Sequence, residues 1–264
     1  MTHKQHAIGT SFTPASTVDD VLAGLDLSGK TAIVTGGHAG IGLEVTRALA
    51  KAGARVVVGA REPSRAANNI VGIEGVEVDA LDLLDPVSID GFAKRQLKNG
   101  VAVHMLINCA VVLGGPERDA RGYEPQFATN HLGHFQLTLA LLPALCAASS
   151  ARVVNVSSGA LRFGSMRWDD LHYRQGFDSL AAYAQSKLAN VLFTVELDRR
   201  WAALGIRGYA VHPGVVAGTK LNSAAGPDTL KRMGLIDEDG QPVIDPVAGK
   251  KTPPQAASTI VFAA

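Results

Sequence analysis

A glycine-rich segment over residues 35–42 constrains the fold of this chain more than any other feature. It reads Thr-Gly-Gly-His-Ala-Gly-Ile-Gly and lies between a β-branched run over residues 30–34 and an apolar helical pattern over residues 43–52. A second apolar run follows over residues 55–59. Strand, glycine turn, helix and strand form a βαβ unit, which predicts parallel strands joined by a right-handed crossover.

The alternation of strand and helix patterns continues along the chain. Further apolar runs predict strands over residues 76–78, 103–107, 152–156 and 208–211. Helical patterns predict helices over residues 87–98, 123–145 and 181–204. Six strands interleaved with helices predict an α/β fold, a doubly wound (Rossmann-type), mostly parallel sheet with helices on both faces in a single domain.

The two ends of the chain have a different composition. Residues 1–28 are polar and are predicted to form an N-terminal arm, so that residues 29–264 hold the Rossmann domain. Residues 217–250, rich in Gly, Asp, Pro and Lys, predict a flexible flap over a site, with one short helix near residues 229–235. The last stretch, residues 254–264, resembles the start of another helix.

Composition excludes several functional classes. A formal net charge of +1 argues against a nucleic-acid-binding protein that relies on a broad basic surface. The chain lacks a run of eighteen apolar residues and a signal-peptide-like N-terminus, so we expect no membrane span and a cytoplasmic location. Cys109 and Cys146 lie in apolar runs without metal-ligand spacing, which predicts buried free thiols rather than a disulfide or zinc site.

Each glycine of the turn has a separate expected role in holding a dinucleotide. Gly36 permits the tight turn, Gly40 lets the backbone approach a pyrophosphate, and Gly42 allows close packing of helix and sheet. The phosphates would meet the positive end of the helix that begins near Ile41, with His38 inside the turn. The alternative is a connector that binds nothing, which the surrounding strands and helix disfavour.

The residue at the end of the second strand predicts the nucleotide. An acidic residue at that position would favour NAD, whereas an arginine accommodates a 2′-phosphate. Here Ala60 leaves the acidic position empty and Arg61 follows. NADP(H) is therefore the favoured cofactor. NAD(H) stays open, because Arg61 could be an ordinary surface charge.

A second motif, Tyr183-Ala-Gln-Ser-Lys187, places a phenol and an ammonium on one face of a predicted helix. A neighbouring positive charge favours the phenolate and would lower the tyrosine pKa from about 10. Such a tyrosine can exchange a proton with an alcohol or carbonyl oxygen. By itself the spacing is common in helices, and its meaning depends on the rest of the chain.

Together these motifs resemble those of the short-chain dehydrogenase/reductase family, in particular the branch that contains retinol dehydrogenases and WW-domain-containing oxidoreductase. Several further stretches carry the resemblance, which covers about residues 28–220. The residues that correspond to the family's functional positions are Asp82 and Leu83, Asn108 and Ala110, Asn130, Ser158, and Pro213, Gly214, Val216 and Thr219. One departure is Val111, which stands where the family has a glycine close to the cofactor.

The resemblance implies hydride transfer between a nicotinamide and an alcohol or carbonyl carbon. Tyr183 would be the acid-base group, Lys187 would lower its pKa and hold the nicotinamide ribose, and Ser158 would stabilise the substrate oxygen. Asn130 would fix a helix bend and a water that connects Lys187 to solvent. Asp82 and Leu83 would contact adenine, and the loop from Pro213 to Thr219 would contact the nicotinamide end.

Other interpretations remain open on the sequence alone. Ser158 could cap a turn, and the protein could be a non-catalytic dinucleotide-binding sensor or scaffold on the same fold. His131, His134 and His172 lack ligand partners at suitable spacing, which favours structural histidines over a metal site.

The partner expected from the resemblance is a small alcohol or carbonyl compound. Leu161, Phe163, Met166 and Trp168 indicate either an apolar substrate pocket or packing within the 158–183 insert. The resemblance also implies a homodimer or homotetramer, the common oligomeric states of the family.

Overall fold

The computed structural model describes residues 8–98, 100–216, 219 and 226–264. Its centre is one six-stranded parallel sheet with the strand order β3-β2-β1-β4-β5-β6. The strands are β1 (Thr31–Thr35), β2 (Arg55–Ala60), β3 (Val76–Ala80), β4 (Met105–Asn108), β5 (Ala151–Val156) and β6 (Ile206–Val211). The prediction of a doubly wound α/β domain is confirmed.

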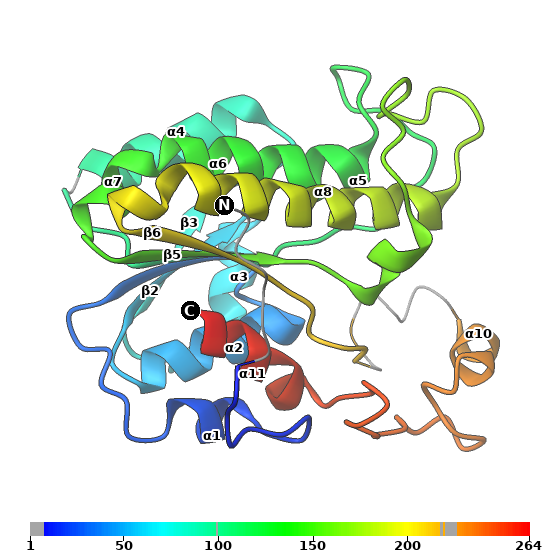
Figure 1. Cartoon of the computed structure of the whole chain (residues 1–264), viewed down its shortest axis with the longest axis horizontal. Coiled ribbons are helices and arrows are strands. Elements are labelled where there is room, and N and C mark those ends of the chain that lie inside the picture. Colours follow the sequence, from blue (N-terminus) through cyan, green and yellow to red (C-terminus); the bar gives the residue numbers. More distant parts are fainter. Residues whose placement is uncertain (1–7, 99, 217–218, 220–225) are drawn as a thin grey trace.

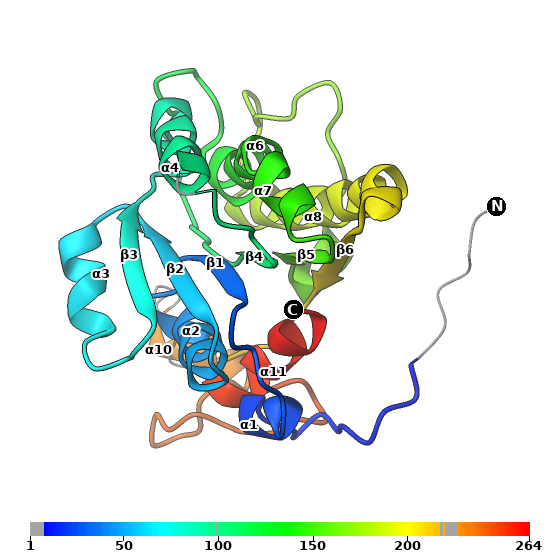
Figure 2. The ribbon, with the colours of Figure 1, turned by 90° about the vertical axis from the view of Figure 1, so that its left-hand side faces the viewer.

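Helices cover both faces of the sheet (Figures 1 and 2). One face carries α4 (Pro86–Lys98), α6 (His134–Ala140), α7 (Leu142–Ala147) and α8 (Ser179–Trp201). The other carries α1 (Val18–Leu22), α2 (Gly40–Lys51) and α11 (Pro253–Ala263), whose apolar side chains form a second core with the strands. Because both faces are covered, β1 and β4 are buried along their whole length, as expected of a parallel sheet.

One helix that the sequence reading did not include connects β2 to β3. It is α3 (Pro63–Asn69), which begins with a proline in its first turn and packs against both strands. A parallel pair of strands needs such a crossover. The helix was not predicted because it is short and its sequence is mostly polar.

The single helix predicted over residues 123–145 is wrong. The structure divides this stretch into α5 (Pro125–Phe127), a π-helical turn η1 (Ala128–Gly133), α6 and α7. The last break falls at Leu141, just before Pro143, whose ring cannot continue the hydrogen-bond ladder. The π-helical turn adds a bend in the middle of the stretch.

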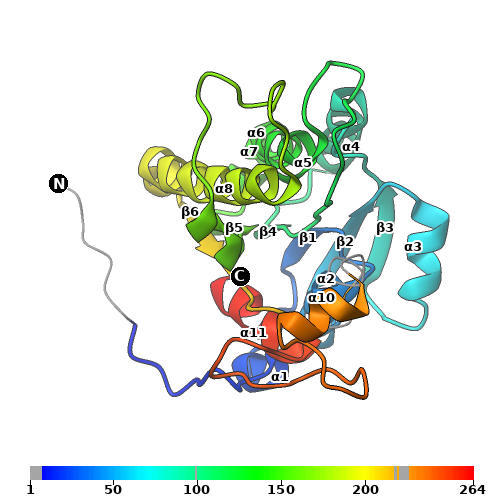
Figure 3. The same cartoon turned by 90° about the vertical axis from the view of Figure 1, so that its right-hand side faces the viewer.

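The segments that follow β5 and β6 lie beyond the carboxyl ends of the strands, on the side that faces the viewer in Figure 3. After β5 comes the short 3-10 helix η2 (Gly159–Phe163), and after β6 comes α10 (Pro227–Arg232). The structure ends β6 with a loop that segment 245–251 holds by backbone hydrogen bonds, including Val215 N to Gly249 O at 2.8 Å. In an open α/β sheet this edge is where ligands bind.

Candidate active site

The glycine turn after β1 is held by close backbone contacts. Gly36 has φ +67°, and a Cβ atom there would lie 3.0 Å from the Cα atom of Ala110. A Cβ atom at Gly42 would lie 2.6 Å from the carbonyl oxygen of Gly36. Gly40 has φ +52° and open space where a side chain would be. The turn is therefore packed on its protein side and accessible at Gly40.

The start of α2 suits an anionic ligand. Ala39 occupies the N-cap position without a side-chain hydrogen bond, and the first turn of this 12-residue helix carries no acidic residue. Its first backbone N–H groups therefore meet no side-chain acceptor at the cap. Unsatisfied N–H groups and the helix dipole at such an end attract phosphate groups. The turn and helix thus fit the pyrophosphate of a dinucleotide.

Arg61 follows β2 at the same edge of the sheet. Its side chain is two-thirds exposed, and its Nη2 atom lies 3.8 Å from Oε1 of Glu62. Such a long, exposed ion pair contributes little to stability. Arg61 can therefore reorient toward a ligand at small energetic expense. His38 lies within the turn, where its carbonyl oxygen accepts a hydrogen bond from Asn69 Nδ2 at 3.1 Å.

The structure brings Ser158, Tyr183 and Lys187 together. Ser158 stands at the N-cap of η2, directly beyond β5, and its Oγ accepts the N–H of Ala160 at 3.2 Å. Tyr183 and Lys187 lie one turn apart on α8, with the ammonium 5.7 Å from the centre of the tyrosine ring. The Lys187 ammonium donates to the Val156 carbonyl at 2.9 Å. Burial lowers the pKa of Lys187 to about 8, with the neighbouring Cys109 acting in the opposite direction.

The pKa of Tyr183 does not follow the simple expectation from the Tyr-Lys spacing. Burial raises this pKa above its usual value, and a hydrogen bond with Ser158 acts in the opposite direction. Burial dominates this pKa in the protein alone, where the Lys187 ammonium donates to the Val156 carbonyl. In the protein alone, Tyr183 is therefore held protonated, as a general acid requires.

Asn130 lies in the π-helical turn and is completely buried. Its side chain accepts the N–H of Val112 at 2.9 Å and donates to the Val112 carbonyl at 3.1 Å. It also donates to Ser186 Oγ on α8 at 3.2 Å. Asn130 thus connects the bend of its own helix to the loop after β4 and to the helix that carries Tyr183.

Comparison with known proteins agrees with this geometry. The sequence model of the short chain dehydrogenase family matches residues 30–229. The chain belongs to the short-chain dehydrogenase/reductase family. Members are oxidoreductases that act on CH–OH and C=O groups, and their fold binds NAD or NADP.

Individual relatives are moderately similar over most of the chain. A protein of Streptomyces antibioticus described as "Probable oxidoreductase" is 41% identical over 249 residues, covering 91% of this chain and 81% of the relative. Human retinol dehydrogenase 12 is 44% identical over 199 residues, covering 73% of this chain and 63% of its own length. These matches confirm the resemblance to the retinol dehydrogenase branch.

Solved structures show the same fold. An uncharacterized protein from Mycobacterium Paratuberculosis superposes with a TM-score of 0.69 at 36% identity, covering 88% of this chain and 82% of the other. A protein from Beutenbergia cavernae, described as an NAD(P) dependent gluconate 5-dehydrogenase with bound NADP, superposes with a TM-score of 0.70 at 27% identity. This match covers 90% of both chains.

Two other predicted cofactor contacts in this short-chain dehydrogenase follow β3. Asp82 accepts the N–H of Leu84 through Oδ1 at 2.9 Å, which makes a tight turn at the end of the strand. Leu83 is buried, and a Cβ atom at Gly133 would lie 2.3 Å from its carbonyl oxygen. The π-helical turn therefore packs directly against the Asp82–Leu83 segment.

Asn108 and Ala110, after β4, are placed differently from each other. The Asn108 side chain is buried in the core, where its amide donates to Asn155 Oδ1 at 2.8 Å and to Thr138 Oγ1 at 3.2 Å. Any contact of Asn108 with a cofactor would therefore involve its backbone. Ala110 packs against Gly36 beside the glycine turn.

Val111 needs no unusual backbone. Among the described residues other than glycine, only Ser149 and Tyr173 have positive φ values. The glycine that the family has at this position is therefore not required here for conformational reasons.

The loop after β6 contains the remaining predicted contacts. Gly214 has φ +84°, and a Cβ atom there would lie 2.6 Å from the Gly249 carbonyl oxygen. Val216 is buried, and its carbonyl accepts the Thr219 hydroxyl at 3.3 Å. Pro213 is also buried within this loop. Much of the predicted flap, residues 217–218 and 220–225, lies outside the described residues, as do residues 1–7 of the predicted arm.

A buried series of hydrogen bonds that links the glycine turn to α8 was not predicted from the sequence. The Thr35 hydroxyl accepts the N–H groups of Cys109 and Ala110 at 2.9 and 3.0 Å and lies 2.8 Å from His134 Nε2. His134 Nδ1 lies 3.0 Å from the Asn130 carbonyl, so Nδ1 carries the proton and Nε2 accepts from Thr35. Burial lowers the pKa of His134 to about 3, which keeps the ring neutral. No sequence spacing indicates the contact between Thr35 and His134, because the Asn130 group that His134 bonds is a backbone carbonyl, which any residue supplies.

Two of the three histidines considered for a metal site, His131 and His172, make contacts within the fold. His131 Nδ1 bonds Asn190 Oδ1 at 3.1 Å, and the His172 ring stacks on Tyr123 with a centroid distance of 4.1 Å. Within the described part of the chain, no cluster of three potential metal ligands occurs. Both cysteines are free thiols, but Cys146 is exposed, so the prediction that it is buried is wrong.

The insert between Ser158 and Tyr183 exposes two of its four predicted apolar side chains. Phe163 is 80% exposed and Trp168 is 71% exposed, so most of each side chain faces solvent. Leu161 and Met166 are half-buried. Among the helices of the described residues, none combines the length and apolar character needed to cross a membrane.

Proposed function

We propose that this short-chain dehydrogenase transfers a hydride between NADP(H) and an apolar alcohol or carbonyl compound. The observation that carries the proposal is the convergence of Ser158, Tyr183 and Lys187 at the carboxyl edge of the sheet, beside a glycine turn that fits a dinucleotide. When bound, the nicotinamide supplies or accepts the hydride.

The protein's own groups would handle the proton. Tyr183, held protonated by burial, donates its proton to a substrate carbonyl oxygen. In the reverse direction the Tyr183 phenolate accepts the proton of an alcohol. Ser158 hydrogen-bonds the same oxygen and stabilises the charge that develops there. Lys187, with a pKa of about 8, is mostly an ammonium at neutral pH and favours a phenolate on Tyr183 as the proton leaves. Asn130 holds the π-helical bend through which a water would reach Lys187.

Cofactor contacts would come from both sides of the site. The proposed pyrophosphate contacts are Gly36, His38, Gly40, Ile41 and Gly42, with Arg61 at the 2′-phosphate and Asp82 and Leu83 at the adenine. Asn108, through its backbone, and Ala110 would also contact the cofactor. The proposed nicotinamide-side contacts are Tyr183, Lys187, Pro213, Gly214, Val216 and Thr219. With NADPH as the cofactor, we expect carbonyl reduction to be the main direction.

The apolar character of the substrate rests on the insert and the loop after β6. Phe163 and Trp168 expose large apolar surfaces on the insert, and Val215 is 39% exposed on the loop. Large exposed aromatic side chains are suited to contact an apolar ligand. Residues 217–250 would act as a flap over this substrate, within a Rossmann domain spanning residues 29–264 and preceded by an arm.

We further propose a homodimer or homotetramer assembled through α6 and α8. Phe135 and Leu139 on α6 are 40% and 43% exposed, and Leu192 and Val195 on α8 are 45% and 60% exposed. The rings of Phe135 and Phe193 lie 5.1 Å apart, so the two helices present one continuous apolar surface. Sedimentation equilibrium of the wild type and of a Leu192→Lys, Val195→Lys variant tests this assembly, which a monomeric wild type would exclude.

The nucleotide choice is tested by fluorescence titration with NADPH and with NADH. We expect the wild type to prefer NADPH, and Arg61→Ala to reduce that preference by roughly tenfold, the size of one exposed ionic hydrogen bond to phosphate. Arg200→Ala, which removes an exposed arginine at the far end of α8, is the matched control. An unchanged preference in Arg61→Ala would exclude Arg61 as the selector.

The reaction is tested by turnover of a panel of apolar ketones and aldehydes with NADPH. Tyr183→Phe should lower kcat by about 10²–10⁴-fold, because it removes only the acid-base hydroxyl, while NADPH affinity changes little. Equal turnover by both proteins would refute the role of Tyr183. Cofactor binding without turnover of any substrate by the wild type would instead favour a sensor or scaffold on this fold.

A further inference from the structure

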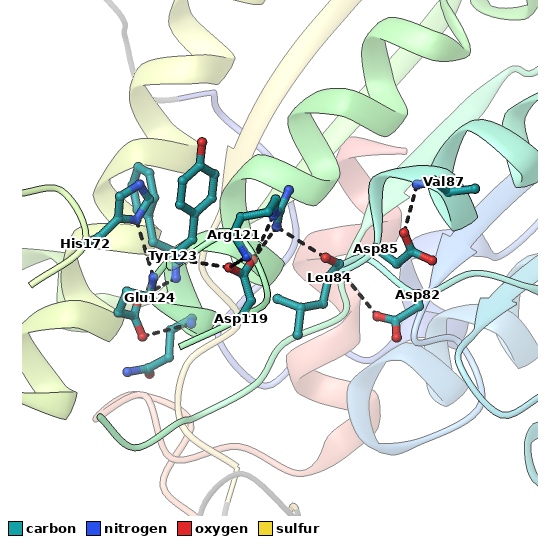
Figure 4. A network of polar contacts seen from close by, with 11 residues as sticks. Asp82, Leu84, Asp85, Val87, Asp119, Arg121, Tyr123, Glu124 and His172 are labelled. Carbon is teal, nitrogen blue, oxygen red and sulfur yellow. Dashed lines mark hydrogen bonds and ion pairs between the residues drawn. The ribbon is translucent and has the colours of Figure 1, made fainter. Parts of the chain in front are cut away.

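A turn over residues 118–124 contacts both the segment after β3 and the insert, although it belongs to neither (Figure 4). Asp119 organises it. Its Oδ1 accepts the N–H groups of Arg121 and Tyr123 at 2.9 and 2.8 Å, and its Oδ2 accepts Arg121 Nε at 2.8 Å. Burial acts to raise the pKa of Asp119, but these bonds outweigh it and hold the pKa below its usual value. The carboxylate thus fixes the Arg121 side chain in one orientation.

Arg121 reaches from this turn to the segment after β3. Its Nη2 atom donates to the carbonyl oxygen of Leu84 at 3.2 Å. Asp82 Oδ1 accepts the backbone N–H of Leu84 at 2.9 Å. Leu84 is therefore fixed on both its backbone groups, the N–H by Asp82 and the carbonyl by Arg121. Without either contact, the segment after β3 would be held by one hydrogen bond at Leu84 in place of two.

The guanidinium of Arg121 is itself well constrained. It lies 4.8 Å from the centre of the Tyr123 ring, which stacks on His172 of the insert. Its side chain is only one-third exposed, and its Nη2 atom forms an ion pair with Asp119 at 2.7 Å. A pre-organised arginine loses little conformational entropy when it holds a carbonyl.

We propose that Arg121 is a positioning residue for the adenosine half of the cofactor, acting through the Leu84 carbonyl on the Asp82–Leu83 segment. This inference rests on the proposed function, because it assumes that the segment after β3 contacts the adenosine. Arg121 itself would not contact the cofactor. Loss of the Arg121 side chain should weaken the binding of ligands that carry adenosine. The affinity for ligands without adenosine should not change.

The test compares NADPH with reduced nicotinamide mononucleotide, which lacks the adenosine half. We expect Arg121→Gln to raise the Kd for NADPH about 3- to 10-fold, as the loss of one charged hydrogen bond allows, with no change for the mononucleotide. Arg121→Lys, which keeps a cation able to reach the Leu84 carbonyl, should recover part of the NADPH affinity. Both Kd values come from fluorescence titration of the intact chain.

Arg118→Gln is the matched control. Arg118 belongs to the same turn, but its guanidinium donates to the carbonyl groups of His172 and Tyr173 in the insert. It should leave NADPH affinity unchanged. An equal effect of the two substitutions, an unchanged Kd for NADPH in Arg121→Gln, or equal weakening of both ligands would each overturn the inference. A wild type that binds neither NADPH nor NADH would overturn the proposed function and this inference together.

Discussion

The cofactor half and the substrate half of the candidate site are built from different parts of the polypeptide. Around β1 and α2, backbone contacts backbone, and a methyl group added at Gly42 would lie 2.6 Å from the Gly36 carbonyl oxygen. Around the insert, side chains extend into solvent, with Phe163 80% exposed. The first half leaves no space for a side chain at Gly36 or Gly42, whereas the second tolerates variation.

This difference corresponds to what each half must recognise. A dinucleotide has one shape, and a tightly packed turn with oriented N–H groups can be complementary to it in advance. Substrates differ among relatives on one fold, so the surface that recognises them must change without affecting the core. Tyr183 and Lys187 lie on α8, and burial is the largest influence on the pKa of each.

The largest effect is expected at Lys187. The folded pKa of Lys187 is about 8 against an unperturbed 10.5, so between these values the unfolded chain binds more protons and stability rises with pH. Lys187→Met removes the buried charge. It should be more stable than the wild type by up to about 3 kcal/mol near pH 7, with the difference shrinking between pH 8 and 10.5. Urea unfolding across this range measures it, and a difference that does not vary with pH would contradict the assignment.

A smaller but decisive effect is expected in the cofactor half. Gly42→Ala should destabilise the protein by about 2 kcal/mol, because the new methyl group must displace backbone rather than a flexible side chain. Gly91→Ala in α4 is the matched control. There the new Cβ atom meets only the end of the Arg95 side chain, at 3.3 Å.

Since alanine is a better helix former than glycine, the free energy of unfolding of Gly91→Ala should rise by about 0.5–1 kcal/mol. Thermal and urea unfolding give both values. Destabilisation by both substitutions to the same extent would mean that the cofactor half is no more tightly packed than an outer helix.

The same difference explains what could be predicted from the sequence. The fold and the glycine turn were readable, because β-branched runs and glycines at fixed spacing reflect local backbone requirements. The helix α3 was not, because it carries a weak apolar pattern. The bend at Asn130 was indicated by the family resemblance and not by a local pattern, because it depends on contacts of Asn130 with Val112 and Ser186.

The hydrogen-bond partners of polar side chains buried in the core could not be predicted from the sequence either. The Asn108 amide bonds Thr138 and Asn155, which lie 30 and 47 positions away in the sequence. The contact between Thr35 and His134 joins residues that the sequence separates by 99 positions. No periodicity encodes such pairings, since they depend on how strands and helices are brought together by the whole fold.

The smallest effect on stability is expected in the substrate half, where it separates two interpretations of the insert. Phe163→Ser and Trp168→Ser should each change the free energy of unfolding by less than about 0.5 kcal/mol, because side chains 80% and 71% exposed lose almost no packing. If these rings contact an apolar substrate, KM for long-chain ketones should rise several-fold while KM for a small ketone stays the same. Leu180→Ser, at an exposed position at the start of α8, is the control for a general loss of surface apolar area. A fall in unfolding free energy of 2 kcal/mol or more would instead assign both rings to packing within the insert and remove the contrast between the two halves.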